Sequence, residues 1–556
     1  MPESSSIAHQ DTRCDSRLMT AALLALSGLA WLLSWPPIDL WPMSFLWAAL
    51  LIRAVLGARN LWWMGFVCLL VYSLCWAWLL RWVIEVSGPG YPVMAIYSAV
   101  WMVLFVMVYR RLAVHGFLAS LPQSVTAPVI WLAIEYLRAE IVLGAWPWYL
   151  AGMPLVHWPV LAQIADLGGV WMVGLLVMST GTALGQWMMP DAGNRRPIVS
   201  TVVASVALIL SVAYGYWRML PVDSPELGRY LLVQTNLPQD NKIGWSFAQQ
   251  QEDLPAFMEM TRQGLQESGG AQLVIWPETT VPGPGFDPDN AEFFDRYQEA
   301  ARFLKHWPEQ LWRFVHSIET PMLVGTNTWS GSVTIEREGD QGWFVPEFQY
   351  NSATLLMPGG SVSSYHKVFP TPFGERLPWI DSWPWLRDQL LELGARGMSL
   401  SLDPGPYQGN ISLNQNEMET VLATPICFEA TVPSVTRSLI RQGGGSTDLL
   451  VNLSNDGWFG SVDGGRLQHA LASRFRCIEW RQPMLRVANT GQTAWYDSCG
   501  REMATLPART AGTLMATPQG DGRRTLYGII GNTIPIVCLI TMALSFVLGF
   551  RREQHS

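Results

Sequence analysis

The sequence predicts a polytopic helical membrane domain of about eight spans, with an α/β domain inserted before the last span. Three observations support this prediction. Hydrophobic residues make up 49% of the 556-residue chain and charged residues only 14%, which is typical of a membrane protein and unusual for a soluble enzyme. Uncharged apolar stretches follow one another through the first part of the chain, and a long polar interval precedes a final apolar stretch.

Each apolar stretch is close to the roughly 20 residues that a helix needs to cross about 30 Å of hydrocarbon. The predicted spans are 18–35, 41–56, 60–80, 92–110, 124–144, 167–188, 197–217 and 527–549. We interpret the first as a span and not a cleaved signal peptide, because it lacks a clear small-residue cleavage site. The predicted domains are therefore a membrane domain at 1–217, a catalytic domain at 218–526, and a final span with a cytoplasmic tail at 527–556.

Arginines beside the spans predict the orientation, because Lys and Arg near span ends are retained on the cytoplasmic side. They alternate between the two sides as eight crossings require: Arg13 and Arg17, Arg53 and Arg59, Arg110 and Arg111, Arg195 and Arg196, Arg551 and Arg552. Both termini are predicted to be cytoplasmic. The polar interval then lies on the opposite face, which is the periplasm in a bacterium with two membranes.

Within the polar interval, short apolar runs are broken by Gly, Pro, Asn and Asp, a pattern typical of buried strands. The expected strands are 230–234, 273–276, 322–325, 353–357, 421–427 and 449–453, and two expected surface helices are 247–267 and 467–479. This mixture favours an α/β sandwich. A simple Rossmann sheet is disfavoured, because no GxGxxG follows a strand.

Charge and cysteine usage exclude several classes of partner. The formal net charge is −8, and the basic residues form no aromatic-interleaved patch, so nucleic acid is not an expected partner. The seven cysteines contain no CxxC pair and have no spacing typical of a zinc or disulfide framework. We therefore expect no metal and no cofactor.

Three motifs place reactive side chains at strand ends, where α/β folds expose active groups. They are LVIWPETTVP with Glu278, YHKVFPTPFGERLP with Lys367 and Glu375, and VLATPICFEATVP with Cys427 and Glu429. A lysine beside an acyl-transfer site can donate to an oxyanion and lower the pKa of a nearby thiol. A cysteine at a strand-to-helix turn resembles a nucleophile elbow, and the helix N-terminus would favour its thiolate. Each residue alone has a structural interpretation, but Glu, Lys and Cys in this order are the pattern of the nitrilase superfamily.

Specifically, WPE, HK followed by PFGE, and ICFE resemble the nitrilase domain of apolipoprotein N-acyltransferases. Further similar stretches are VQTNLPQD followed by Trp245, YNSATLLMPGG with Asn351, SNDGWFG with Trp458, RVANTGQTAW, and GAWPWYLAG with Trp148. The resemblance covers nearly the whole chain and implies a nitrilase-like αββα sandwich. Phe428 departs from the family's usual Tyr, His366 from its usual Asn, and the segment 282–321 is long for the family.

The resemblance implies N-acylation of the N-terminal diacylglyceryl-cysteine of apolipoproteins from a phospholipid donor, the last step of bacterial lipoprotein maturation, in the inner membrane. It assigns Cys427 as the nucleophile that carries a thioester, Glu278 as the base and Lys367 as the oxyanion donor. The supporting residues would be Glu375, Glu429 and Asn351, and the lipid entrance would be lined by Trp148, Trp245 and Trp458. The expected partners are the phospholipid, the diacylated apolipoprotein and membrane lipid, and the chain is expected to be a monomer.

Two alternatives stay open at this stage. A membrane-tethered amidase or nitrilase would use the same Glu, Lys and Cys but pass the thioester to water. The second is a transporter or scaffold that has lost catalysis. Intramembrane charges would support transport, but the predicted spans contain few besides Glu135 and Arg138. We interpret this i,i+3 pair as a structural ion pair.

Overall fold

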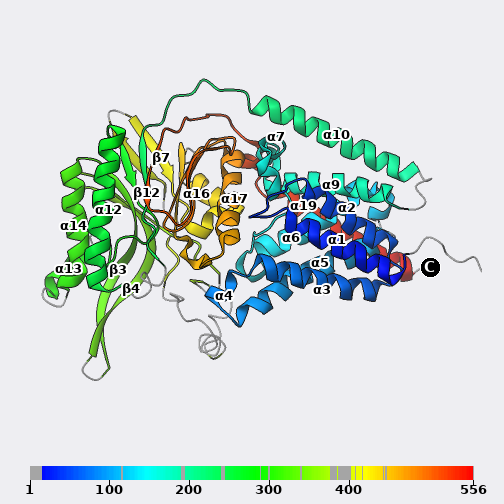
Figure 1. The fold of residues 1–556 in the computed structure, drawn as a ribbon, viewed down its shortest axis with the longest axis horizontal. Coiled ribbons are helices and arrows are strands. Elements are labelled where there is room, and N and C mark those ends of the chain that lie inside the picture. Colours follow the sequence, from blue (N-terminus) through cyan, green and yellow to red (C-terminus); the bar gives the residue numbers. More distant parts are fainter. Residues whose placement is uncertain are drawn as a thin grey trace, which may run out of the picture.

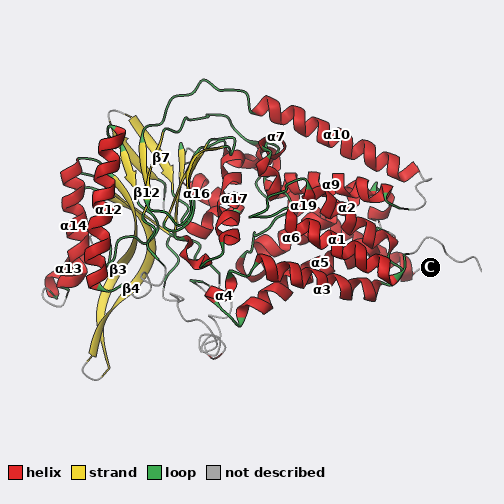
Figure 2. Ribbon diagram, in the orientation of Figure 1, coloured by secondary structure: helices red, strands yellow, loops and turns green. Residues whose placement is uncertain are grey.

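The computed structural model describes residues 15–113, 117–189, 195–238, 245–287, 290–297, 301–338, 341–372, 374–375, 385, 402–406, 409–415, 418–442, 444 and 447–554. A helical part and a part with two sheets lie side by side along the long axis of the molecule (Figure 1). The strands all lie in the second part (Figure 2).

Every predicted span coincides with a helix of the helical part. The long helices are α1 (Arg17–Leu33), α2 (Met43–Gly57), α3 (Leu61–Leu79), α5 (Gly90–Leu112), α6 (Gln123–Tyr136), α9 (Val170–Trp187), α10 (Arg195–Arg218) and α19 (Thr533–Gln554). Shorter helices connect them: α4 (Val83–Val86), α7 (Pro159–Ala162), α8 (Ala165–Gly168) and α18 (Leu526–Ile530). Although α19 is the last helix of the chain, it packs against α6 and so belongs to the same bundle as the earlier helices.

Large apolar side chains cover the outer surface of this bundle, as Trp62 (83% exposed) and Ile209 (65% exposed) illustrate. Three described helices are long and apolar enough to cross a membrane by length and composition: Leu61–Leu79, Gly90–Leu112 and Pro197–Arg218. The apolar helices α1, α2 and the described part of α19 are shorter than this criterion requires. Membrane association is therefore supported, whereas the number of eight spans stays a prediction.

The second part contains two six-stranded sheets. The first has the order β12-β1-β2-β3-β4-β5 and the second has the order β11-β10-β9-β8-β7-β6. The strands of the first sheet are β1 (Tyr230–Gln234), β2 (Leu273–Ile275), β3 (Met322–Glu338), β4 (Gln341–Leu356), β5 (Val362–His366) and β12 (Gly512–Ala516). Those of the second are β6 (Ile411–Gln415), β7 (Met418–Ala423), β8 (Leu449–Ser454), β9 (Met484–Ala488), β10 (Thr493–Tyr496) and β11 (Glu502–Leu506).

Helices cover the outer faces of both sheets, which gives the four layers of the expected sandwich (Figures 1 and 2). The flanking helices are α12 (Phe247–Ser268), α13 (Asn290–Arg296), α14 (Arg302–Ile318), α16 (Pro433–Gln442) and α17 (Asp463–Trp480). Alternate residues of β1 point to opposite faces of its sheet. Leu232 packs in the core between the sheets, whereas Leu231 and Val233 pack in the core under α12 and α14. This alternation follows from the two-residue period of a strand.

Most predicted strands are present, with two differences. The strand predicted at 421–427 ends earlier, because β7 stops at Ala423 and Pro425 has no N–H with which to continue a ladder. The strands predicted at 322–325 and 353–357 are the inner ends of β3 and β4, which form a long hairpin. The described side chains in the outer half of this hairpin are exposed or half-buried, so its residues form no continuous buried run like that of the inner ends.

Candidate active site

The Cys427 turn connects β7 to α16. Cys427 adopts φ of 51°, a left-handed conformation that L-residues rarely adopt and that is frequent at functional sites. It begins a short 3₁₀ turn, Cys427–Thr431, directly before α16. The side-chain amide of Asn452 on β8 donates to the carbonyls of Pro425 (2.8 Å) and Cys427 (3.3 Å). Asn452 of the neighbouring strand β8 therefore stabilises the strained turn both before Cys427 and at Cys427 itself.

Glu278 lies in the turn that follows β2, as its position after Pro277 predicts. The next residue, Thr279, has φ of 47°, so the chain bends sharply here. A Cβ on Gly325 of β3 would come within 2.5 Å of the backbone of residues 277–279, so only glycine lets this turn approach. The Glu278 carboxylate accepts hydrogen bonds from Asn351 Nδ2 (2.7 Å) and from the backbone N–H of Asn455 (2.6 Å).

Lys367 follows β5 and points its ammonium between two carboxylates. Its Nζ donates to Glu375 Oε2 at 2.6 Å and to Thr371 Oγ1 at 3.3 Å, and it lies 3.7 Å from Glu278 Oε1. Asn351 on β4 bridges the two acids, because its Nδ2 also reaches Glu375 Oε1 at 3.2 Å. Glu278, Lys367, Glu375 and Asn351 therefore form one connected group.

The two carboxylates keep Lys367 charged. Burial disfavours its ammonium, but Glu375 and Glu278 outweigh this cost and raise the pKa of Lys367. Burial likewise opposes ionisation of Glu375, but Lys367 and the N–H of Thr371 outweigh it and lower the pKa of Glu375. A fixed ammonium and a fixed carboxylate thus lie side by side in a water-poor site.

The Cys427 thiol is held in its protonated form. Burial is the largest cause that raises its pKa, and the negative charge of Glu278 adds to it, whereas Lys367 opposes it without prevailing. Lys367 thus lowers the pKa of the thiol as expected, but burial outweighs this effect in the resting site. The sulfur becomes a nucleophile only when a base takes its proton, and Glu278 is close enough to influence that proton.

Glu429 organises the nucleophile turn. Its carboxylate accepts hydrogen bonds from the N–H groups of Ile426, Val368 and Phe369 and from the Tyr365 hydroxyl, at 2.8–3.0 Å. These donors come from the Cys427 turn and from the segment around Lys367, so one side chain fixes the nucleophile relative to the cation. Burial raises the pKa of Glu429 to about 7, against the opposing effect of Lys367 and these donors.

Phe428 points into the protein and is buried. Its ring lies nearly parallel to that of Phe369, with the centroids 6.3 Å apart. Phenylalanine at this position therefore packs the nucleophile turn against the segment that follows Lys367.

The three predicted lipid-entrance tryptophans lie in different surroundings. Trp148 is buried where the two parts meet, and its ring centroid lies 5.7 Å from that of Phe459. Trp458 directly precedes Phe459 in a 3₁₀ turn. Trp245 packs against the core under α12 and α14 and donates to Asp253 (2.9 Å). Trp148 therefore lies beside the turn that contains Trp458, whereas Trp245 belongs to a separate cluster.

Several contacts of the site could not be inferred from the sequence. The Tyr365 hydroxyl donates to Glu429, the Asn452 amide to the carbonyl of Cys427, and the Asn455 backbone N–H to Glu278. Asp456 is buried and accepts from His469 Nδ1 (2.9 Å) and Arg486 Nη2 (2.7 Å). The SNDGWFG motif marked this segment by resemblance, but its partners could not be deduced from spacing. Among the described residues, no group of three or more His, Cys, Asp or Glu is placed to hold a metal ion.

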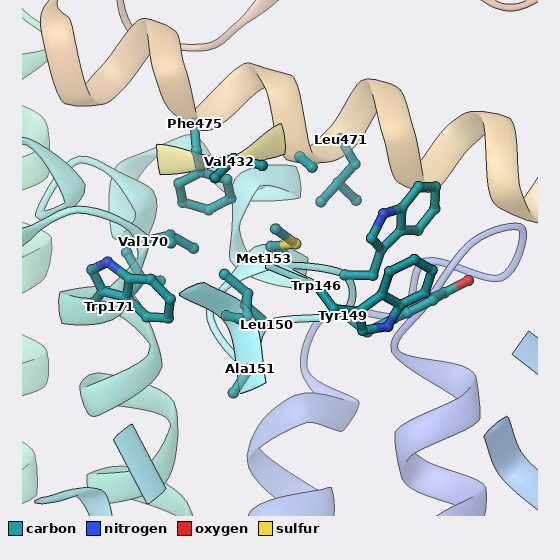
Figure 3. Close-up of a cluster of buried hydrophobic side chains, with 14 of the residues drawn as sticks. Trp146, Tyr149, Leu150, Ala151, Met153, Val170, Trp171, Val432, Leu471 and Phe475 are labelled. Atoms are coloured by element: carbon teal, nitrogen blue, oxygen red, sulfur yellow. The ribbon is translucent and has the colours of Figure 1, made fainter. Parts of the chain in front are cut away.

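This arrangement can perform acyl transfer. A thiol at a strained turn, a buried carboxylate and a buried ammonium can supply a nucleophile, a base and an oxyanion donor. The site lies on the side of the sandwich that meets the helical part, because Val432, directly after the Cys427 turn, joins the cluster formed by residues 149–153 and α17 (Figure 3).

Comparisons with known proteins agree with this geometry. The carbon-nitrogen hydrolase family matches residues 233–525, more than half of the chain, and the apolipoprotein N-acyltransferase N-terminal domain family matches residues 27–183. The apolipoprotein N-acyltransferase of Chlorobaculum tepidum is 28% identical over 94% of both chains. That of Geobacter metallireducens is 26% identical over 96% of this chain and 95% of its own.

A solved amidase from Nesterenkonia sp. aligns with 55% of this chain and 96% of its own, at 17% identity and a TM-score of 0.35. That score is too low to bear on function. The matches of both parts, in the same order and over nearly the full length of the relatives, are what assigns the family. The chain belongs to the carbon-nitrogen hydrolase family and, within it, to the apolipoprotein N-acyltransferases, a family of membrane-associated acyltransferases.

Proposed function

We propose that the protein transfers an acyl chain from a phospholipid to the N-terminal amine of the diacylglyceryl-cysteine of apolipoproteins, through a thioester on Cys427. The observation that carries this proposal is the placement of Glu278, Lys367 and Cys427 beside an apolar helical part. Both substrates carry acyl chains that are costly to remove from lipid, at roughly 0.8 kcal/mol for each CH₂. A site that adjoins the bilayer lets them reach the nucleophile without leaving it.

In the first half-reaction, Glu278 takes the proton of the Cys427 thiol as the sulfur attacks the ester carbonyl of the phospholipid. Lys367 donates a hydrogen bond to the oxyanion that develops. When the carbon–oxygen bond breaks, protonated Glu278 returns its proton to the leaving alkoxide. The products are a lysophospholipid and a Cys427 thioester.

In the second half-reaction, the α-amine of the diacylated cysteine attacks the thioester carbonyl and loses a proton to Glu278. Lys367 again stabilises the oxyanion. The carbon–sulfur bond breaks, the amide forms, and the proton on Glu278 returns to the sulfur. One carboxylate therefore serves as base and acid in both halves, and Glu375, Glu429 and Asn351 keep the three reacting groups in place.

The proposed setting is the bacterial inner membrane, with eight spans, both termini in the cytoplasm and the site on the periplasmic face, in a monomer. Lipid would enter past Trp148, which contacts Phe459 of the catalytic part, and past Trp458, which precedes Phe459. The role predicted for Trp245 at this entrance stays a prediction.

Hydrolysis of the same thioester by water is the alternative reaction. Purified full-length protein is incubated with phospholipid and a synthetic diacylated lipopeptide, and the products are separated by mass spectrometry. We expect N-acylated peptide and lysophospholipid in equal amounts, and neither from the Cys427→Ala variant. Free fatty acid without N-acylated peptide would instead identify a hydrolase.

A further inference from the structure

The 145–151 loop of the helical part, here called the tryptophan loop, is a strained segment held by two buried ionisable side chains. It follows α6, which continues as one π-helical turn, Leu137–Ile141, and then as the 3₁₀ turn Val142–Gly144. Leu143, Ala145 and Tyr149 all have φ between 56° and 78°. Such conformations cost about 1–3 kcal/mol each and persist only where surrounding contacts enforce them.

Glu135 and Arg138 enforce this conformation. Glu135 Oε1 accepts the backbone N–H of Ala151 at 2.8 Å, and Arg138 Nη1 donates to the carbonyls of Trp146 (3.2 Å) and Trp148 (2.8 Å). Glu135 and Arg138 are therefore more than the structural ion pair that the sequence suggested, because both also make hydrogen bonds to the loop. Both residues are almost completely buried, where charged groups are costly and usually have a function.

The far side of the tryptophan loop contacts the catalytic part. Figure 3 shows residues 146–153 packed beneath α17 and Val432. The ring of Trp148 lies 6.0 Å from that of His469 on α17, at an interplanar angle of 27°, and 5.7 Å from that of Phe459. His469 is 2% exposed, so its ring is fixed by these aromatic neighbours.

Hydrogen bonds that begin at His469 and Asp456 connect to both reacting groups, Glu278 and Cys427. Asp456 Oδ1 accepts His469 Nδ1 at 2.9 Å, and its other oxygen accepts Arg486 Nη2 at 2.7 Å. The residue before it, Asn455, donates its backbone N–H to Glu278 Oε2 at 2.6 Å. On the other branch, Arg486 donates to Asn452, which donates to the carbonyl of Cys427.

We infer that Arg138 and Trp148 are positioning residues of the active site, which orient Glu278 and Cys427 through His469 and Asp456. The helical part therefore does more than bind membrane lipid, because it completes the geometry in which the base faces the thiol. This inference rests on the proposed role of Glu278 as the base. It predicts that a defect in the tryptophan loop slows chemistry at Cys427 even when no lipid is present.

The test measures alkylation of Cys427 by iodoacetamide in the full-length protein in detergent, followed by mass spectrometry of the Cys427 peptide. The variants are Trp148→Leu, Trp148→Phe, Arg138→Met and the double variant Trp148→Leu/Arg138→Met. Matched controls are Trp47→Leu, which removes another buried tryptophan of the bundle, and Arg53→Met, which removes another buried arginine. Monodispersity and thermal unfolding establish that each variant is folded.

We expect Trp148→Leu and Arg138→Met each to lower the alkylation rate about tenfold or more, because small misplacements of reacting groups have large effects. The alkylation rate of the double variant should be no lower than that of the slower single variant, because both residues act through the same series of contacts. Trp148→Phe should restore the rate to within about threefold, and the controls should remain within about twofold. With phospholipid as donor, Arg138→Met, which lies outside the proposed lipid entrance, should lower kcat and leave KM unchanged.

Rates within about twofold of wild type for both single variants would overturn the inference, as would losses equal to those of the controls. If Trp148→Leu does not fold, His469→Asn replaces it, because asparagine can still donate to Asp456 but has no ring to contact Trp148. Alkylation requires no lipid substrate. A protein that shows this pattern without transferring acyl chains would contradict the proposed function and leave the inference intact.

Discussion

Two buried carboxylates support the same site in different ways. Glu375 meets the Lys367 ammonium directly, at 2.6 Å, and its pKa is lowered although burial opposes this. Glu429 meets backbone N–H groups and the Tyr365 hydroxyl, and burial raises its pKa to about 7. Glu375 neutralises the charge of Lys367, whereas Glu429 connects the Cys427 turn to the segment that follows Lys367 through hydrogen bonds. Substitutions should therefore separate an electrostatic function from an organising one.

Removal of the cation should have the largest effect. Lys367→Met deletes the oxyanion donor, which is worth about 10²–10³ in kcat, and leaves two carboxylates buried without their partner, at a cost of about 3–5 kcal/mol. We expect acyl-transfer activity to fall at least 10³-fold and thermal stability to fall with it. Steady-state kinetics and thermal unfolding measure both. Lys305→Met on α14 is the control, and a comparable loss there would show that the effect is not specific.

Neutralising the charge-balancing carboxylate should come next. Glu375→Gln keeps the size and one acceptor oxygen but removes the anion closest to Lys367. We expect kcat to fall about 10²-fold, the upper range for loss of a partner that orients a reacting group, with KM for phospholipid nearly unchanged. The exposed Glu309→Gln on α14 is the matched control. Full activity of the Glu375→Gln variant would show that the Glu375 charge is not needed to position Lys367.

The organising carboxylate should tolerate the same change better. Glu429→Gln retains one acceptor oxygen but directs an amide toward backbone donors, and one unsatisfied buried group costs about 1–3 kcal/mol. We expect kcat to fall about tenfold. An effect larger than that of Glu375→Gln would reverse the comparison between the two carboxylates.

The pKa of Glu429 also predicts the pH dependence of stability. Because this pKa is raised from 4.5 to about 7, the folded protein binds more protons here than the unfolded chain between these values. The free energy of unfolding therefore falls as pH rises through this window. Relative to Glu429→Gln, the wild-type melting temperature should decline from pH 5 to pH 8, and a constant difference would contradict the raised pKa.

Phe428→Tyr should have the smallest effect. The added hydroxyl would lie in the buried contact with Phe369, outside the hydrogen bonds that join Glu278, Lys367 and Glu375. We expect kcat within about threefold of wild type. A rise or fall of more than tenfold would mean that a hydroxyl at this position takes part in the reaction.

Glu278 and Cys427 share one property: each ends a predicted apolar strand or follows it closely, and each lies within two residues of a proline. Glu278 and Cys427 could therefore be placed at strand ends from local pattern alone, and resemblance supplied their roles. Asn452 and Asp456 could not be placed, because their importance depends on which strands neighbour one another in the second sheet. Strand order is a property of the packed sandwich and leaves no periodic signal in one sequence.

Buried charges were the hardest features to interpret. The i,i+3 spacing of Glu135 and Arg138 is compatible with an ion pair, but it gives no sign of the hydrogen bonds that both side chains make to the following loop. Likewise, the sequence indicated that Lys367 lowers the pKa of Cys427, but it could not show that burial raises this pKa by more. Burial and tertiary contacts are determined only by the folded arrangement.

The central claim is that Cys427 carries the acyl chain and depends on Glu278 and Lys367 to do so. The most direct test is intact-protein and peptide mass spectrometry of full-length protein incubated with phospholipid and no lipopeptide. The account predicts one acyl-sized adduct on Cys427, its retention in Cys477→Ser, its absence in Cys427→Ala, and its release on addition of diacylated lipopeptide. An adduct on another residue, or an acyl chain on Cys427 that lipopeptide cannot remove, would contradict it.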